Sequence, residues 1–309
     1  MDGMIVIDKP IGPTSHDVVA RVRRVLQERR IGHTGTLDPI ASGVLPLVVG
    51  RGTRLARFFD HDRKQYDALV YLGRSTDTYD AHGATVGPLN EGPLPAREAI
   101  DRALDAFRGT FTQQPPAYSA KKIDGRRSHE LAREHAREGS DAELTLPPPV
   151  SVTAHSIDLV NVRDNLVALR IACSTGFYVR SLANDLGVAL GTGGHLVALR
   201  RTEAGGMTLA SAVSLAAIED GPAGLSLAKE SFMPLRGMLP GMPAITLTEE
   251  GARRAAHGVA IGADLVTDNL LGLPDGAKWA RLLDPSGELV AVSERRDEPG
   301  LLHPVVVLV

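Results

Sequence analysis

Strand-like and helix-like segments follow one another along this chain without strict alternation. Apolar periodicity and β-rich composition predict strands at residues 4–8, 45–49, 64–73, 150–162, 166–173 and 195–201. The short connection Arg-Asp-Asn at residues 163–165 predicts a hairpin between the strands at 150–162 and 166–173. Apolar residues at helical spacing predict helices at residues 13–26, 97–107, 128–137, 178–190 and 249–257. Regular alternation is typical of a parallel α/β fold, so this order instead predicts an α+β fold with a mixed sheet.

Two stretches interrupt this pattern and suggest how the chain is divided. Residues 113–149 are polar, basic and rich in turn residues, which predicts an excursion from the sheet. Residues 236–243 are rich in Gly and Pro and predict a linker. The sequence therefore predicts a main domain at residues 1–236, with an insertion at about 113–149, and a small domain at residues 243–309.

Composition restricts the class of protein. Apolar residues make up 43% of the 309 residues and charged residues 23%, which suits a buried core and excludes a disordered chain. The longest stretch without Asp, Glu, Lys or Arg is 15 residues, at 204–218, whereas a spanning helix needs about 20 apolar residues. Cys173 is the single cysteine, which excludes an internal disulfide and a multi-cysteine zinc site. Because the N-terminus lacks a secretory pattern, we expect a cytoplasmic protein without a membrane partner.

Charge is distributed unevenly along the chain. The net charge is −3, but residues 1–60 hold 9 basic and 6 acidic residues, and residues 121–137 hold 6 basic and 3 acidic residues. Residues 241–309 hold 6 basic and 10 acidic residues. Local positive fields attract a polyanion even where the total charge does not. The charge pattern therefore permits an RNA partner without establishing one.

Residues 31–43 contain three glycines and a proline and are predicted to form a loop. Within this loop, residues 32–39, Gly-His-Thr-Gly-Thr-Leu-Asp-Pro, form the most unusual local sequence. Two glycines permit close approach of the backbone, and Asp38 precedes a proline that fixes a turn. From these residues alone, an Asx-turn is the simplest interpretation of Asp38, and His33 is more typical of a structural or surface residue. Phosphate binding is a weak alternative, because the loop lacks the Gly-Lys-Ser/Thr ending of a P-loop.

Other blocks along the chain give this loop a different meaning. In order they are Asp8-Lys9-Pro10, Gly12, Thr14-Ser15, residues 32–39, Ser42-Gly43, Leu45-Pro46, Lys64, Tyr66, Leu72-Gly73, Thr76-Asp77-Thr78, Asp80, Pro115-Pro116, Tyr118-Ser119-Ala120-Lys121, Cys173, Gly176, Tyr178-Val179-Arg180 and Leu199-Arg200-Arg201. With these blocks, roughly residues 1–215 resemble the TruB-type tRNA pseudouridine-55 synthases, and several ordered blocks are more specific than one motif. The resemblance implies a mostly antiparallel catalytic sheet flanked by helices, followed by a small β-barrel of the PUA type.

The resemblance implies an isomerisation that uses no cofactor and no metal. Uracil is detached from C1′ of a uridine in the tRNA T-loop, rotated and rejoined through C5. Breaking the N1–C1′ bond leaves an electron-poor carbon, which a carboxylate can attack or stabilise. Asp38 matches the family's catalytic aspartate and Arg180 the arginine that pairs with it. Tyr66 matches the tyrosine that packs on the target base and is favoured for removing the C5 proton.

Taken alone, two of these residues have simpler interpretations. Tyr66 alternates with apolar residues in a predicted strand, as an ordinary core aromatic does. Arg180 lies near a predicted helix start, where a surface ion pair is the commoner role of an arginine. The functional interpretation is favoured because Asp38, Tyr66 and Arg180 all stand at family positions.

Further residues are implied to contact RNA, because a base in the folded T-loop must be extruded before it reaches an active site. His33 matches a histidine beside the flipped bases, Tyr178 a substrate-contacting tyrosine and Leu199 an apolar residue of the uracil pocket. Packing is the simpler explanation of Tyr178 and Leu199. Lys9 resembles a residue that supports the catalytic loop, and phosphate contact is an equal alternative. The insertion resembles an RNA clamp, although a solvated charge run is the simpler explanation of its basic residues Lys121, Lys122, Arg126 and Arg127.

Two alternatives to a stand-alone isomerase stay open. One is a tRNA-folding chaperone that binds RNA and opens the T-arm, and the other is the guide-RNA-dependent relative of this family. The trio of Asp38, Tyr66 and Arg180 favours catalysis, because a protein that only binds has no use for it. The long insertion and the poorly matched C-terminal segment favour the stand-alone type. We therefore expect a monomer that acts on the tRNA T-arm without an obligatory protein partner.

Overall fold

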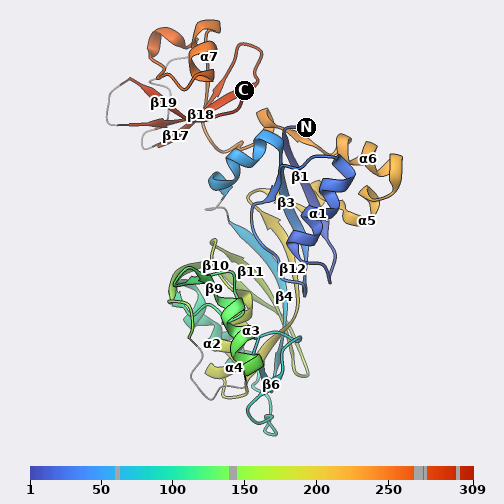
Figure 1. Ribbon diagram of the computed structural model, residues 1–309. Helices are drawn as coiled ribbons and strands as arrows, with labels where there is room; N and C mark the ends of the chain where they lie inside the picture. Colours follow the sequence, from blue (N-terminus) through green and yellow to red (C-terminus); the bar gives the residue numbers. More distant parts are fainter. Residues whose placement is uncertain (60–62, 139–144, 268–273, 275–276, 297–299) are drawn as a thin grey trace.

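The computed structural model describes residues 1–309 except for 60–62, 139–144, 268–273, 275–276 and 297–299. A mixed sheet extends along most of the molecule (Figure 1). Its described strands pair in the order β14 (Val213–Ser214), β1 (Gly3–Lys9), β3 (Ala41–Val49), β12 (Gly194–Ala204), β4 (Lys64–Leu72), β11 (Leu166–Cys173), β10 (Val150–Arg163) and β7 (Gly109–Gln113). Three short strands also pair with it: β2 (Ile31–His33) with β3, β13 (Met207–Thr208) with β12, and β15 (Met233–Pro234) with β1.

Neighbouring strands of this sheet are mostly antiparallel. Among the described pairs, only β1 with β14 and β3 with β12 are parallel. The hairpin predicted between the two β-rich runs is confirmed, since β10 and β11 pair up to Arg163 and Leu166. Its turn places Asp164 at φ 50°, the left-handed conformation that Asp tolerates. The predicted α+β class with a mixed, mostly antiparallel sheet is therefore confirmed.

Helices lie along both halves of this sheet, and one more, α7 (Glu249–Ala256), lies in the C-terminal part of the chain. They are α1 (Ser15–Leu26), α2 (Arg97–Leu104), α3 (Ser128–Glu138), α4 (Val179–Ala189), α5 (Leu215–Ile218), α6 (Gly221–Glu230) and α7 (Glu249–Ala256), with 3₁₀ segments η1 (Gly50–Phe59), η2 (Asp105–Phe107), η3 (Leu209–Ser211), η4 (Leu235–Gly237) and η5 (Ala263–Leu265). Figure 1 shows α1, α5 and α6 beside β1 and β3, whereas α2, α3 and α4 lie at the other end, near β10 and β11. Of the helices described, none has the length and apolar character to traverse a lipid bilayer.

Strand β1 is buried on both faces, because adjacent strand residues point to opposite sides. Ile5 and Ile7 belong to a core cluster that includes residues of α1, α2 and α4. Met4 and Val6 belong to a second cluster, which includes η1 and residues from the C-terminal part of the chain. Packing against a core cluster on each face fixes the position of β1 and of the loop that follows it.

The C-terminal part forms a second, smaller sheet. Its described strands are ordered β16 (Ala244–Thr246), β17 (Trp279–Leu283), β18 (Leu289–Arg295) and β19 (Leu302–Val307), with α7 beside them. This order is an open path, so the described strands do not form a closed barrel. The unit packs against η1, where Arg51 and Arg54 donate hydrogen bonds of 2.5 and 2.6 Å to the carbonyls of Leu308 and Val307.

Two segments differ from the sequence-based expectation. Residues 31–43 were expected to be a loop, but Ile31–His33 is strand β2 and β3 already begins at Ala41, because both segments find sheet partners far away in the sequence. The stretch at 236–243 was expected to be a linker, but it is packed, since Met238 and Leu239 are buried in the second core cluster.

Residues 113–149 contain the hairpin of β8 (Lys122–Ile123) and β9 (Arg126–Arg127), followed by α3. A similar small hairpin joins β5 (Ser75–Thr76) and β6 (Thr85–Val86).

Candidate active site

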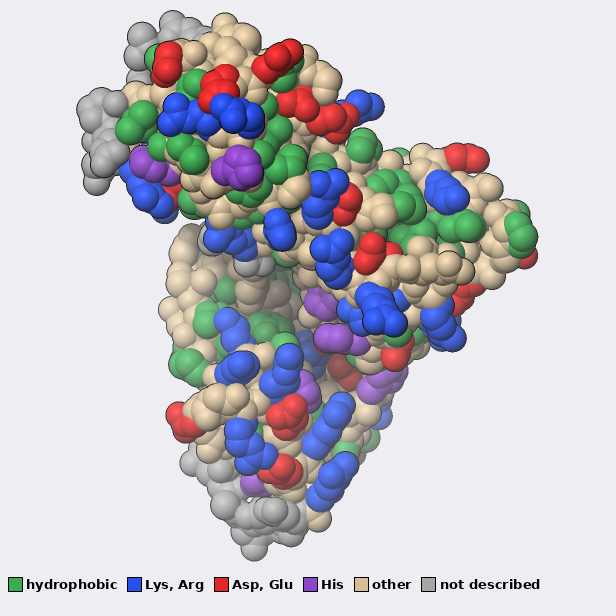
Figure 2. Space-filling model, turned by 45° about the horizontal axis from the view of Figure 1, so that its top comes forward, with side chains coloured by type: hydrophobic (Ala, Val, Ile, Leu, Met, Phe, Trp, Pro, Cys, Tyr) green, Lys and Arg blue, Asp and Glu red, His purple; other side chains and the backbone are tan. Residues whose placement is uncertain are grey.

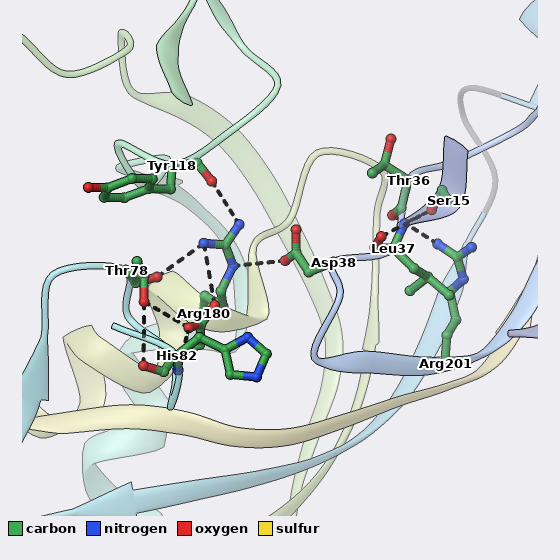
Figure 3. Close-up of polar contacts among 10 residues, drawn as sticks. Ser15, Thr36, Leu37, Asp38, Thr78, His82, Tyr118, Arg180 and Arg201 are labelled. Carbon is green, nitrogen blue, oxygen red and sulfur yellow. Dashed lines mark hydrogen bonds and ion pairs between the residues drawn. The ribbon is translucent and has the colours of Figure 1, made fainter. Parts of the chain in front are cut away.

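The loop between β2 and β3 is tied to the start of α1. The Ser15 hydroxyl accepts a hydrogen bond of 2.8 Å from the Leu37 amide and donates one of 3.0 Å to the Leu37 carbonyl. The amide of Gly12 donates to the carbonyl of Pro39 at 2.9 Å. These contacts hold the residues on both sides of Asp38, so the backbone position of Asp38 is fixed; Figure 3 shows the contact between Ser15 and Leu37.

Lys9, at the end of β1, supports the same loop. Its side chain is fully buried, and Nζ donates to the carbonyls of Ala41 at 2.6 Å and Pro10 at 2.9 Å. Burial lowers the pKa of Lys9 to about 8, although the charge of Asp38 opposes this effect. A buried ammonium bonded to two carbonyls fits support of the loop, and not contact with a phosphate in solvent.

Arg201 holds the loop from β12, and sequence reasoning assigned it no role. Its side chain is buried, with Nε donating to the Val44 carbonyl at 2.7 Å and Nη2 to the Gly35 carbonyl at 3.0 Å. Gly43 of β3 pairs with Arg201 of β12, and a Cβ atom on residue 43 would collide with the Arg201 carbonyl. Only glycine therefore allows β3 and β12 to approach so closely at this point.

Arg180, in the first turn of α4, pairs with Asp38. Its Nε lies 2.8 Å from Oδ2 of Asp38 (Figure 3). The contact is an ion pair without a well-directed hydrogen bond, since the Nε–H has no hydrogen-bond partner among the described residues. Nη1 donates to the Thr78 carbonyl at 3.0 Å and Nη2 to the Tyr118 carbonyl at 2.9 Å. The Arg180 side chain is 5% exposed and that of Asp38 is 35% exposed, so a fixed cation holds a carboxylate that a ligand can reach.

Asp80 completes the support of Arg180 and was also missed as a site residue. Its Oδ2 lies 3.8 Å from Nη1 of Arg180, and its Oδ1 accepts hydrogen bonds from the Thr78 hydroxyl at 2.7 Å and the His82 amide at 3.0 Å. The Thr76 hydroxyl donates to the Asp80 carbonyl at 2.7 Å. This small network fixes the Thr78 carbonyl that orients Arg180. The sequence blocks contained these residues, but nothing local indicated that they meet an arginine about 100 residues later.

Tyr66 and Leu199 lie in neighbouring strands of the sheet. Tyr66 of β4 is buried, as is Leu199 of β12, which is opposite Ala68 in β4 and Ala41 in β3. Burial raises the pKa of Tyr66 above its ordinary value, and the positive charge of Arg201 opposes that rise. Tyr66 is thus a buried phenol within electrostatic range of Asp38.

Tyr178 and His33 border the same region. Tyr178 precedes α4, and the side chain of Gln113 holds its backbone by accepting from its amide at 2.8 Å and donating to its carbonyl at 3.0 Å. Burial raises the pKa of Tyr178, and the Asp38 charge adds to the rise. His33 packs edge-on against His16 with ring centroids 5.3 Å apart, and burial lowers its pKa. The charge of Asp38 therefore influences the pKa of Lys9, Tyr66 and Tyr178.

The basic residues of the insertion are largely open to solvent. Lys122, Arg126 and Arg127 are exposed and Lys121 is half-buried. Arg126 forms an ion pair with Glu134, which reduces the positive charge that it offers to a ligand. Figure 2 shows Lys and Arg side chains on both sides of a hollow between the upper and lower parts of the molecule.

Asp38 and Arg180 form the centre of the candidate site, and their pairing indicates a defined chemistry. An accessible carboxylate held by an arginine is suited to stabilise positive charge on a carbon or to attack it. The buried side chains of Tyr66 and Leu199 lie on neighbouring strands of the same sheet. Within the described part of the chain, no group of three or more His, Cys, Asp or Glu side chains is arranged to hold a metal ion.

Family models match a large part of the chain. Residues 23–179 match the TruB family pseudouridylate synthase N-terminal domain, and residues 180–240 match the tRNA pseudouridylate synthase B C-terminal domain. A relative from Solibacter usitatus, named tRNA pseudouridine synthase B, is 43% identical over 313 residues and covers 100% of both chains. The chain belongs to the TruB family. A relative of the same name from Geobacter sulfurreducens is 41% identical over 298 residues, covering 95% of this chain and 93% of its own.

Solved structures share the fold at lower sequence identity. A chain of a Cbf5-Nop10-Gar1 complex superposes with a TM-score of 0.74 at 24% identity, covering 99% of this TruB-family chain and 85% of its own. A chain of an H/ACA RNP bound to a substrate RNA containing 2′-deoxyuridine gives 0.72 at 22% identity, with the same coverage. These matches extend over the C-terminal sheet, so the architecture of the whole chain has known counterparts.

Proposed function

We propose that this TruB-family enzyme isomerises uridine to pseudouridine at position 55 in the T-loop of tRNA. The observation that carries the proposal is the pairing of a reachable carboxylate, Asp38, with a buried arginine, Arg180, in a chain 43% identical to a tRNA pseudouridine synthase B. Isomerisation needs no external leaving group, so one carboxylate is sufficient, unlike the two of a glycosidase.

In this mechanism Asp38 acts at C1′ of the target nucleotide. The N1–C1′ bond breaks while the carboxylate attacks or stabilises the electron-poor carbon, and Arg180 pairs with that carboxylate and orients it. The uracil then rotates and C5 forms a bond with C1′. The hydrogen on C5 leaves as a proton, for which Tyr66 is the favoured acceptor. Over the whole reaction one proton leaves C5 and one is taken up at N1, so the net composition is unchanged.

Access to the base requires extrusion from the T-loop. Flipping costs a few kcal/mol of unstacking, which contacts on the protein must offset. We assign His33 to the space beside the flipped bases, and Tyr178 and Leu199 to the walls around the uracil. Lys121 and Lys122 belong to an insertion that clamps the RNA backbone by charge.

The remaining parts of the proposal concern the whole chain. Residues 243–309 act as a PUA-like unit. Its net charge of −4 disfavours binding to phosphates. Its principal role is therefore to stabilise η1 and the main sheet by packing against them. The enzyme works in the cytoplasm as a monomer, without guide RNA and without an obligatory protein partner. The higher identity to stand-alone relatives, 43% against 24% for the Cbf5 chain, supports this choice over the guide-dependent alternative.

The test is to incubate the purified chain alone with an unmodified tRNA transcript and to map pseudouridine by carbodiimide adducts that stop reverse transcription. We expect one new stop, at position 55, and none in a transcript that carries cytidine there. Modification at another position would overturn the assignment of the T-loop target. Activity only after addition of a guide RNA would establish the guide-dependent alternative instead.

A further inference from the structure

Arg201 is a buried cation whose described partners are all neutral. Its side chain is 1% exposed, and its guanidinium donates to the carbonyls of Val44 at 2.7 Å, Gly35 at 3.0 Å and Thr36 at 3.5 Å. Among the described residues, no Asp or Glu forms an ion pair with it. Burial of a charge is costly unless it is paired, and carbonyl dipoles satisfy the N–H groups without cancelling the charge. The positive charge of Arg201 is therefore available to a neighbour.

That neighbour is Tyr66. The two residues are directly opposite each other where β12 pairs with β4 in an antiparallel register. Side chains at opposite positions of an antiparallel pair lie on the same face, with Cβ atoms about 5 Å apart. The adjacent Arg200 points elsewhere and pairs with Asp8 at 2.8 Å. The register of β12 thus directs one arginine toward the phenol and the next one away from it.

The other groups that face Tyr66 do not favour a phenolate. Cys173 of β11 has a pKa raised to about 12 by burial, so its thiol is neutral below that pH. The carboxylate of Asp38 opposes a second negative charge nearby. Arg201 acts in the opposite direction, chiefly by its positive charge. Among Arg201, Cys173 and Asp38, the described groups that act on Tyr66, Arg201 is thus the one that stabilises the deprotonated form.

We propose that Arg201 is a positioning residue that fixes the catalytic loop through its carbonyl contacts and, with the same guanidinium, stabilises the phenolate of Tyr66 as proton acceptor. The proposal rests on the proposed function. Before the step, the phenol loses its proton to solvent. The phenolate oxygen then takes the proton from C5, and the electron pair of the C5–H bond forms the C5=C6 double bond. The C6=N1 electron pair moves to N1, which takes up a proton from solvent, and Arg201 contributes only its charge.

The test measures the ionisation of Tyr66 directly. The five tyrosines are replaced by 3,5-difluorotyrosine, whose more acidic phenol brings the titration into an accessible pH range, and are followed by fluorine NMR. The signal of Tyr66 is assigned by its absence in Tyr66→Phe. We expect Arg201→Gln to raise the titration midpoint of Tyr66 by about one pH unit, a tenfold change in proton affinity. Arg201→Lys restores the charge and should return the midpoint toward that of the wild type.

The matched control is Arg200→Gln, which removes the neighbouring arginine and should leave the midpoint unchanged. An unchanged midpoint in Arg201→Gln would overturn the proposal and leave Arg201 as a structural support only. If Arg201→Gln does not fold, the test is made on the wild type by nitrogen NMR. The chemical shift of Arg201 Nε should then change with the same pH midpoint as Tyr66. In Tyr66→Phe this pH-dependent change should disappear. Absence of that shared titration would also overturn the proposal. A wild type that modifies no tRNA, with these midpoints as expected, would contradict the proposed function but not the contact between Arg201 and Tyr66.

Discussion

The Nε atom of Arg180 lies 2.8 Å from Oδ2 of Asp38, while the other two nitrogens of the same guanidinium donate to backbone carbonyls. All three directions of the planar fork are therefore occupied before any substrate binds. The carbonyl partners belong to Thr78 and Tyr118, in two separate segments. The geometry explains how one arginine, anchored by two other segments, can orient the carboxylate of a loop residue.

Replacement of Arg180 by lysine tests this arrangement. Lysine keeps the charge but has no planar fork, so it cannot serve Asp38, Thr78 and Tyr118 together. We expect Arg180→Lys to lower the single-turnover rate at least about 100-fold, with tRNA affinity changed only slightly. Filter binding and rapid-quench kinetics on one preparation separate the two effects. A variant with near wild-type rate would show that charge alone is sufficient.

The buried ammonium of Lys9 predicts a specific pH dependence of stability. The pKa of Lys9 is about 8 in the folded protein and about 10.5 in the unfolded chain, so between these values the unfolded state binds a proton that the folded state has released. Stability must therefore rise with pH in this window. Relative to Lys9→Met, the wild type should gain on the order of 2–3 kcal/mol of unfolding free energy between pH 7 and pH 10.

Urea unfolding of both proteins at several pH values measures this difference, and other titrating groups cancel in the comparison. Lys9→Met should differ from the wild type most strongly in its pH slope above pH 8. A stability difference that is the same at pH 7 and pH 10 would show that the ammonium is not desolvated in the folded state.

The exposed basic side chains of the insertion predict a salt-dependent contribution to RNA binding. Simultaneous replacement of Lys121, Lys122 and Arg127 by alanine removes up to three charges that can bind phosphates. The slope of log affinity against log salt should decrease by about one for each phosphate that is no longer neutralised, while the rate at saturating tRNA stays the same. The exposed Lys229 of α6 provides the control, since Lys229→Ala should leave the slope unchanged. An unaltered slope in the triple variant would make the insertion a solvated charge run.

Local patterns predicted most of the fold. The alternation around Tyr66, the helical spacing that starts at Ser15 and the turn at 163–165 are all decided by neighbouring residues, and the structure agrees. The prediction was wrong at Ile31–His33, which looks like loop because its glycine and polar residues have no strand pattern. That segment becomes a strand through pairing with β3, a tertiary contact that no local pattern reveals.

The candidate site also combines residues that the sequence indicates with residues that only the folded structure reveals. Asp38, Arg180 and Tyr66 were singled out through the resemblance to a family, and from the residues alone each had a simpler interpretation. Thr78, Asp80 and Arg201 received no role, because their contacts join residues separated by 102 and 166 positions in the sequence. Side chains that act by holding other groups leave no spacing to detect. A buried arginine bonded to loop carbonyls becomes visible only in the folded chain.

The central claim is that Asp38 acts at C1′ in the isomerisation of a tRNA uridine. The most direct measurement is the release of tritium from a tRNA transcript labelled at C5 of its uridines, with purified wild type compared with Asp38→Asn. Pseudouridine formation must expel the C5 hydrogen, whereas binding or refolding of the tRNA leaves it in place. We expect about one equivalent per tRNA from the wild type and none from Asp38→Asn, with tRNA affinity within about threefold of the wild type because phosphate contacts dominate affinity. Release by Asp38→Asn at the wild-type rate, or tight binding by the wild type with no release, would contradict the claim.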